Sequence, residues 1–156
     1  MIKLIRVDHR LLHGQVVFSW TKSQGIERII VIDNATSKDD FKKMSLKMAK
    51  PEGIRLNVFS VEGAVGKLDQ IKALKANTML LFGNVTELYR FMQSLGKVDE
   101  INYGGIPERP KAKRYSNAVF LTDEEVEMTK KLCDMGITVS MQQVPTARKE
   151  VLNEKL

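Results

Sequence analysis

The chain has 156 residues, of which 43% are apolar and 28% are charged, and its formal net charge is +6. A chain of this length can bury a hydrophobic core of its own, so we expect one domain over residues 1–156. No apolar run approaches the roughly 18 residues of a membrane span, and the N-terminus enters a strand pattern without the features of a signal peptide. The single cysteine, Cys133, fits a reducing compartment, and we therefore expect a soluble, cytoplasmic protein.

The positive charge raises the question of nucleic-acid binding. Most lysines are scattered over segments with helical patterns, as on a solvated face, and only residues 109–114 form a compact basic loop. No helix-turn-helix, zinc-finger or RNA-recognition signature accompanies that loop. We expect no nucleic-acid partner. Docking to an acidic or phosphorylated protein is the preferred interpretation of the loop, with a plain solvated loop as the alternative.

Segments with strand and helix patterns alternate along the whole chain. The strand patterns lie near residues 2–7, 28–32, 54–60, 78–82, 98–103, 116–121 and 137–143, and several of them are continuous apolar runs. Between them, helical patterns cover about 14–23, 37–49, 61–75, 85–95 and 123–135. Two segments have no regular pattern, namely the Gly- and Pro-rich loop 104–114 and the polar tail 144–156.

Capping residues support these helices. Thr36 or Ser37 is expected to cap the second helix, and Thr122 followed by Glu125 has the spacing of a capping box before the last helix. Gly136 lies where a helix C-terminus would need a left-handed residue.

Alternation of this kind predicts an α/β fold, with an open, mainly parallel, doubly wound sheet of about seven strands and helices on both faces. Ligands of such sheets bind outside the carboxyl ends of the strands, at a topological switch point. The loop over residues 8–13, which follows the first strand, is predicted to lie at that edge. The same edge would carry Asp33–Asn34, Ser60, Gly83–Asn84 and Gly104–Gly105.

The loop contains both histidines of the chain, and several chemistries can be separated. His9 and His13 have the spacing of two metal ligands on a helix, but two ligands are too few for structural zinc and Arg10 would repel the cation. No Gly-x-Ser-x-Gly elbow supports a hydrolase triad. Residues 63–68 lack the spacing and hydroxyl of a nucleotide-binding P-loop. We therefore expect no metal and no cofactor.

A histidine that carries a phosphoryl group itself is the fourth chemistry. Neutral imidazole is a nucleophile, and a neighbouring guanidinium at Arg10 would favour the neutral ring and then bind phosphate oxygens. Gly14 would let a partner protein approach closely, and the N–H groups from Gln15 onward would face the phosphate. Asp8 would fix the imidazole tautomer or orient Arg10. The residues alone leave three interpretations open: a phosphoryl carrier, a site for an unspecified small ligand or phosphate, and an inert solvated turn.

The segment Arg6–Val16, RVDHRLLHGQV, resembles the phosphorylation motif of the IIB components of the bacterial sugar phosphotransferase system, in the mannose/fructose/sorbose family. The resemblance continues over essentially the whole chain. It includes Trp20, Arg28–Val31, Lys47–Gly53, Met79–Asn84, Ile101–Gly105, Asn117–Val119 and Val144–Pro145. One departure is Gly83, which stands where relatives more often have a polar or basic residue.

The resemblance implies a phosphotransferase that accepts a phosphoryl group from a phosphohistidine of a IIA domain. The group then passes to a sugar held by the membrane components IIC and IID. It assigns the phosphorylated nitrogen to Nδ1 of His13 and supporting roles to Arg10 and Asp8. The expectation that Gly14 and Gln15 bind the phosphate comes from the residues themselves. His9 falls at a variable position and receives no role.

The resemblance also allows a homodimer. It does not specify the sugar, which belongs to a class including mannose, fructose, sorbose and N-acetylated amino sugars. A regulatory module that keeps the fold without serving sugar uptake is the alternative function.

Overall fold

The central element of the structure is one twisted sheet. The computed structural model describes residues 1–156, and seven strands pair in a single spatial order. That order is β3 (Arg55–Phe59), β2 (Arg28–Ile32), β4 (Thr78–Phe82), β1 (Ile2–Asp8), β5 (Glu100–Gly105), β8 (Thr138–Met141) and β9 (Glu150–Val151). All neighbours are parallel except β9, which runs antiparallel to β8.

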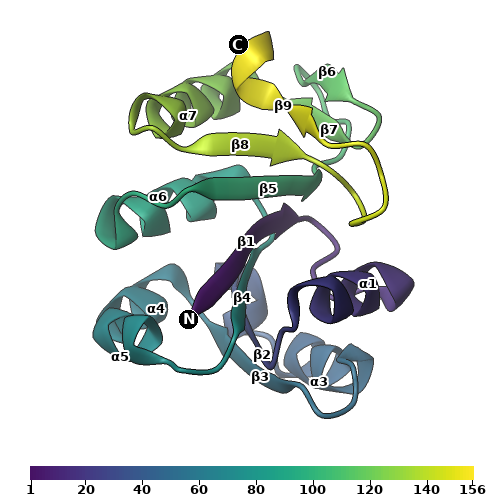
Figure 1. Cartoon of the computed structure of the whole chain (residues 1–156), viewed down its shortest axis with the longest axis vertical. Coiled ribbons are helices and arrows are strands. Elements are labelled where there is room, and N and C mark those ends of the chain that lie inside the picture. Colours follow the sequence, from purple (N-terminus) through teal and green to yellow (C-terminus); the bar gives the residue numbers. More distant parts are fainter.

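Helices cover both faces of this sheet (Figure 1). One face carries α1 (Gly14–Gln24) and α3 (Asp40–Ala49), with the one-turn helix α2 (Asn34–Ser37) before α3. The other face carries α4 (Val61–Gly66), α5 (Leu68–Ala73), α6 (Val85–Leu95) and α7 (Asp123–Asp134). The predicted doubly wound α/β architecture is confirmed. None of these helices is long and apolar enough to span a membrane.

The two faces differ in how apolar they are. A cluster of 23 buried hydrophobic residues lies on the α4–α7 face, whereas the α1–α3 face has a cluster of 8. Because side chains alternate along a strand, Ile5 and Val7 of β1 point into the larger core. The residues between and after them, Arg6 and Asp8, lie on the α1 face and are nevertheless buried. The α1 face therefore has a polar centre.

Two strand predictions need correction. Residues 116–121 do not form one strand of the main sheet, because the chain turns back at Asn117–Ala118 and makes a separate hairpin. Its strands are β6 (Lys113–Ser116) and β7 (Val119–Leu121). The seventh strand of the main sheet is instead β9, in the tail predicted to be irregular, and it is followed by the short 3-10 helix η1 (Leu152–Lys155). A two-residue strand has no pattern of its own, and pairing with β8 defines it.

Two helix predictions also change in detail. The second predicted helix, 37–49, is the shorter α3, which begins at Asp40 and is capped by Asp39 rather than by Thr36 or Ser37. The separate one-turn helix α2 precedes it and is capped by Asp33. The third is divided into α4 and α5 at Lys67. The capping box of Thr122 and Glu125 is confirmed, with both hydrogen bonds present.

Candidate functional site

The loop between β1 and α1 is held in one conformation by its own residues. β1 ends at Asp8, and α1 begins at Gly14, directly after His13. Leu12 is buried in the smaller core, and Leu11 adopts the left-handed region with φ of 56°, which non-glycine residues rarely do. The N–H of Leu11 donates to the carbonyl of Asp8 at 2.9 Å. Buried Leu12 and this turn together present His13 at the carboxyl edge of β1, between β4 and β5.

Asp8 and His13 form a direct hydrogen bond. The Nε2 atom of His13 lies 2.9 Å from Oδ2 of Asp8, whose side chain is 1% exposed. Burial alone would raise the pKa of Asp8, but the hydrogen bond from His13, the N–H of Arg10 and the charge of Arg6 outweigh it, so this pKa lies below its ordinary value. Asp8 is therefore an anion at neutral pH. A carboxylate only accepts, so Nε2 carries the proton, and Nδ1 keeps its lone pair in the neutral ring.

Arg10, Gly14 and Gln15 are exposed residues of the same loop and of the helix start that follows it. The N–H of Arg10 donates to Oδ1 of Asp8 at 3.0 Å, and its Nε lies 4.0 Å from the same atom, while the side chain is half exposed. Gly14 and Gln15, the first two residues of α1, are exposed. The structure thus brings together all five residues that the sequence predicts for the site.

The N-terminus of α1 differs from those of most other helices; α5 also lacks a side-chain cap but has Asp69 in its first turn. A side chain accepts from the first turn in α2, α3, α4, α6 and α7, whereas His13 makes no such capping bond to α1. No acidic residue stands in the first turn of α1 either. The N–H groups and positive dipole end of an 11-residue helix are therefore left without an anionic partner beside His13.

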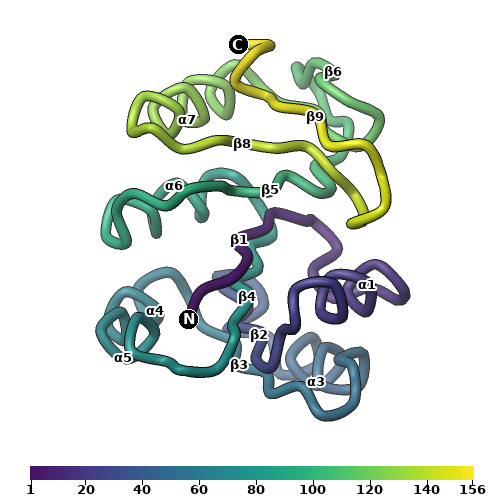
Figure 2. Tube along the Cα trace, in the orientation of Figure 1, coloured from purple at the N-terminus to yellow at the C-terminus, as the bar shows by residue number.

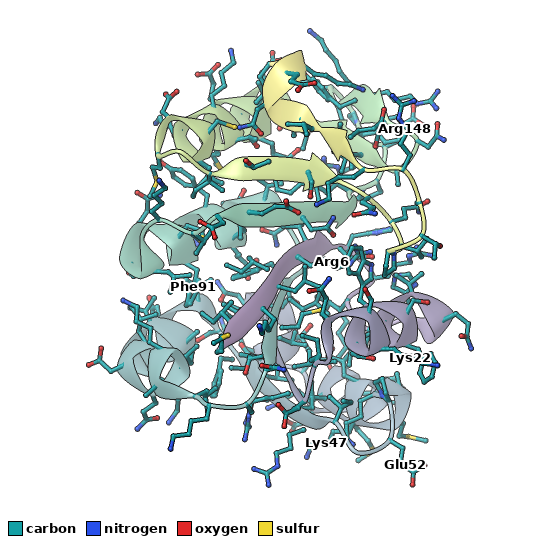
Figure 3. The ribbon with its side chains drawn as sticks, viewed as in Figure 1. Arg6, Lys22, Lys47, Glu52, Phe91 and Arg148 are labelled. Carbon is teal, nitrogen blue, oxygen red and sulfur yellow. The ribbon has the colours of Figure 1, made fainter.

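A residue that the sequence analysis gave no role, Arg6, lies near the end of β1, where Figure 3 labels it. Its guanidinium donates to Oδ2 of Asp8 at 3.0 Å and to Oδ1 of Asn102 at 2.5 Å. It also donates to the carbonyl oxygens of Gln142 at 3.1 Å and Gln143 at 3.0 Å, in the loop after β8. Figure 2 shows that loop beside the end of β1. In the sequence Arg6 is one of two charged residues in the first strand pattern, together with Lys3, so nothing there distinguishes it as buried.

The second histidine and the basic loop are arranged differently. His9 is exposed and has no side-chain hydrogen bond to Asp8. Partial desolvation lowers its pKa, Asp8 opposes that shift, and Arg10, His13 and Arg109 add to it in decreasing order. Arg109 is not a free cation of a basic patch, because it binds both carboxylate oxygens of Glu125 at 2.7 and 3.0 Å. The exposed cations of that loop are Lys111, Lys113 and Arg114.

Most other polar residues at the sheet edge have structural partners. Asp33, Ser60 and Asn84 cap α2, α4 and α6. A Cβ atom at Gly83 would lie 2.6 Å from Oδ1 of Asp33, so glycine here leaves room for that capping carboxylate. The departure at Gly83 therefore has a local packing reason.

A doubly wound sheet with a histidine hydrogen-bonded to a buried carboxylate at the edge of its central strand is an arrangement for binding or transferring a small charged group. The family comparison makes this specific. Residues 2–156 match the family described as the PTS system sorbose subfamily IIB component, and the chain belongs to that family of the sugar phosphotransferase system.

Individual relatives agree with this assignment. The chain is 33% identical over 146 residues to the PTS system mannose-specific EIIAB component of Escherichia coli (strain K12), covering 94% of this chain and 45% of that protein. It thus spans about half the length of such relatives. It is 31% identical to the PTS system sorbose-specific EIIB component of Lacticaseibacillus casei, covering 94% and 89% of the two chains. The crystal structure of the IIB domain of the sorbose permease from Klebsiella pneumoniae superposes with a TM-score of 0.92 at 27% identity, covering 99% and 95%.

Proposed function

We propose that this chain is a phosphoryl carrier of sugar uptake, in which Nδ1 of His13 accepts phosphate from a phosphohistidine of a IIA component. The observation that supports this most strongly is the 2.9 Å contact between Nε2 of His13 and the buried anion Asp8. It favours the tautomer with a free lone pair on Nδ1. The ring is partly exposed, with 20% of its side-chain surface accessible, so a macromolecular donor can approach it.

The first step is an in-line displacement at phosphorus. The Nδ1 lone pair forms the new P–N bond, the P–N bond of the donor histidine breaks, and that nitrogen recovers its electron pair. The proton on Nε2 stays with His13 and is shared with Asp8, which stabilises the positive charge that develops on the ring. Arg10 binds phosphate oxygens, and the N–H groups of Gly14 and Gln15 serve them at the uncapped end of α1.

The second step regenerates the free ring. A hydroxyl oxygen of a sugar held by the membrane components IIC and IID attacks phosphorus, the P–Nδ1 bond breaks, and the hydroxyl proton passes to water. The carrier therefore works in the cytoplasm against those components. Catalysis needs mainly positioning and charge stabilisation, and the site supplies both from its own side chains.

The test is phosphorylation with phosphoenolpyruvate, the general phosphotransferase proteins and a IIA component. We expect one acid-labile, base-stable phosphate on the intact chain, located by mass spectrometry at His13. The His13→Ala variant should lose the label completely. His9→Ala is the matched control, because it removes the only other histidine, and it should be labelled like the wild type. Label that survives His13→Ala, or that requires His9, would contradict the proposal.

A further inference from the structure

Arg6 is a buried cation at the junction of the elements that form the site. Its side chain is 3% exposed, and its guanidinium reaches acceptors on β1, on β5 and in the loop after β8. Its Cζ atom lies 5.3 Å from the centre of the Trp20 ring, and the Nε1 atom of Trp20 donates to the carbonyl of Gln143 at 2.8 Å. Arg6 therefore fixes the end of β1 to both α1 and the Gln142–Gln143 loop.

Two glycines make room for the ion pair between Arg6 and Asp8. A Cβ atom at Gly104 would lie 2.1 Å from Cζ of Arg6, and one at Gly105 would lie 3.0 Å from Oδ1 of Asp8. Neither glycine has the positive φ that would otherwise explain its presence. The two glycines at the end of β5 are therefore explained by the space that the side chains of Arg6 and Asp8 occupy, and not by backbone conformation.

The hydrogen bonds of Asp8 indicate how the Arg6–Asp8 pair affects His13. Nη2 of Arg6 and Nε2 of His13 both bind the same carboxylate oxygen, Oδ2, at 3.0 and 2.9 Å. A carboxylate bound only to an imidazole favours the protonated ring, and a protonated ring has no lone pair with which to attack phosphorus. A second cation on that oxygen neutralises part of its charge.

We propose that Arg6 is a positioning residue which, by sharing Oδ2 of Asp8 with His13, keeps the carboxylate anionic and oriented while preventing it from holding the imidazole in its protonated, unreactive form. This inference rests on the proposed carrier function of His13. It assigns Arg6 an electrostatic role toward the nucleophile in addition to its contacts with the loop.

The test compares the pH dependence of phosphoryl acceptance from a phosphorylated IIA component in the wild type, Arg6→Gln and Arg6→Lys. We expect the acid limb of the Arg6→Gln profile to move to higher pH by about one unit, with acceptance recovering toward the wild type above that limb. Arg6→Lys restores the charge and should move the limb by less than half as much. A uniform loss at every pH with no shift in Arg6→Gln, shown to fold by circular dichroism, would overturn the proposal, and so would a shift in Arg6→Lys as large as that in Arg6→Gln.

Trp20→Phe is the matched control for loop anchoring. It removes the other side-chain donor to the carbonyl of Gln143 but changes no charge, so its profile should keep the wild-type position. A shift equal to that of Arg6→Gln would show that loop anchoring, and not charge, is responsible.

A second readout does not need the partner proteins. Nitrogen NMR of the imidazole over the same pH range should show the protonated ring persisting to higher pH in Arg6→Gln than in the wild type, and identical titrations would overturn the proposal. If the wild type takes no phosphate at all, the carrier function fails, and the NMR comparison still decides the role of Arg6.

Discussion

Replacing Asp8 with asparagine tests the polar network beneath the histidine most directly. The side chain is 1% exposed and accepts from Arg6, His13 and the N–H of Arg10. Asparagine keeps the shape but loses the charge, and its NH2 group must face at least one of these donors. Removing one partner of a buried pair costs about 3–5 kcal/mol. Because Arg6 retains the acceptors on Asn102, Gln142 and Gln143, we expect a loss of about 2–3 kcal/mol.

Urea unfolding measures this loss, and its pH dependence carries a definite sign. With a slope of about 1–3 kcal/mol per molar urea, the midpoint should fall by about 0.7–3 M at pH 7. The pKa of Asp8 is lowered in the folded state, so its stabilising effect is present above the unfolded pKa of about 3.9 and is lost as pH falls through the folded value. The difference between Asp8→Asn and the wild type should therefore shrink below about pH 4.

Asp40→Asn makes the same chemical change at a fully exposed carboxylate, which only pairs with Lys43 in the first turn of α3, and should therefore move the midpoint much less than Asp8→Asn. Equal midpoints for Asp8→Asn and the wild type at pH 7, or a difference that grows in acid, would refute the electrostatic reasoning.

Two further substitutions test neighbouring features. Gly104→Ala would place a methyl group against the Arg6 guanidinium and should lower the free energy of unfolding, measured in urea, by about 1–3 kcal/mol. The control is Gly66→Ala, which has open space around its Cβ position and should not destabilise the protein. Equal effects of the two substitutions would contradict the packing argument. Glu125→Gln should cost about 1–2 kcal/mol at pH 7 in thermal unfolding, because it weakens both the capping box and the Arg109 contact. Burial alone would raise the pKa of Glu125, but the hydrogen bond from Arg109 outweighs it, so this pKa is lowered in the folded state. The cost of Glu125→Gln should therefore disappear in acid, where the wild-type carboxyl is also neutral. A cost that does not depend on pH would contradict this electrostatic explanation.

The parallel sheet and the placement of the site follow from features that are local in sequence. Apolar runs such as Thr78–Phe82 mark strands covered on both faces, and all five residues of that strand are buried. The position of residues 8–13 at the sheet edge follows from their place after the first strand, whatever the later topology. The capping box at Thr122 depends on only four residues, which is why sequence alone predicts it.

The features that sequence reasoning missed depend on contacts between distant segments. Arg6 looks like an interruption of a strand until Asn102 and the loop at 142–143 supply its acceptors, 96 or more residues away. The sequence places Arg109 in a basic cluster, whereas in the folded chain it is paired with Glu125, 16 residues away. The strand at Glu150–Val151 exists only because β8 offers an unpaired edge.

The proposed carrier role requires one histidine to serve two different partners, and the placement of charge around His13 fits that requirement. A carrier must lose its phosphate as readily as it gains it, so neither partner should have to supply the charges that stabilise the imidazole ring. Here the anion and its countercharge lie below the imidazole, where Asp8 and Arg6 are buried, while the exposed side presents Arg10 and the uncapped start of α1. The charges of Asp8 and Arg6 next to the imidazole therefore stay the same whichever macromolecule binds to the exposed side of His13. On this reasoning, exchanging the surface residues around His13 should change partner affinity, whereas changes at Asp8 or Arg6 should alter transfer with both partners alike.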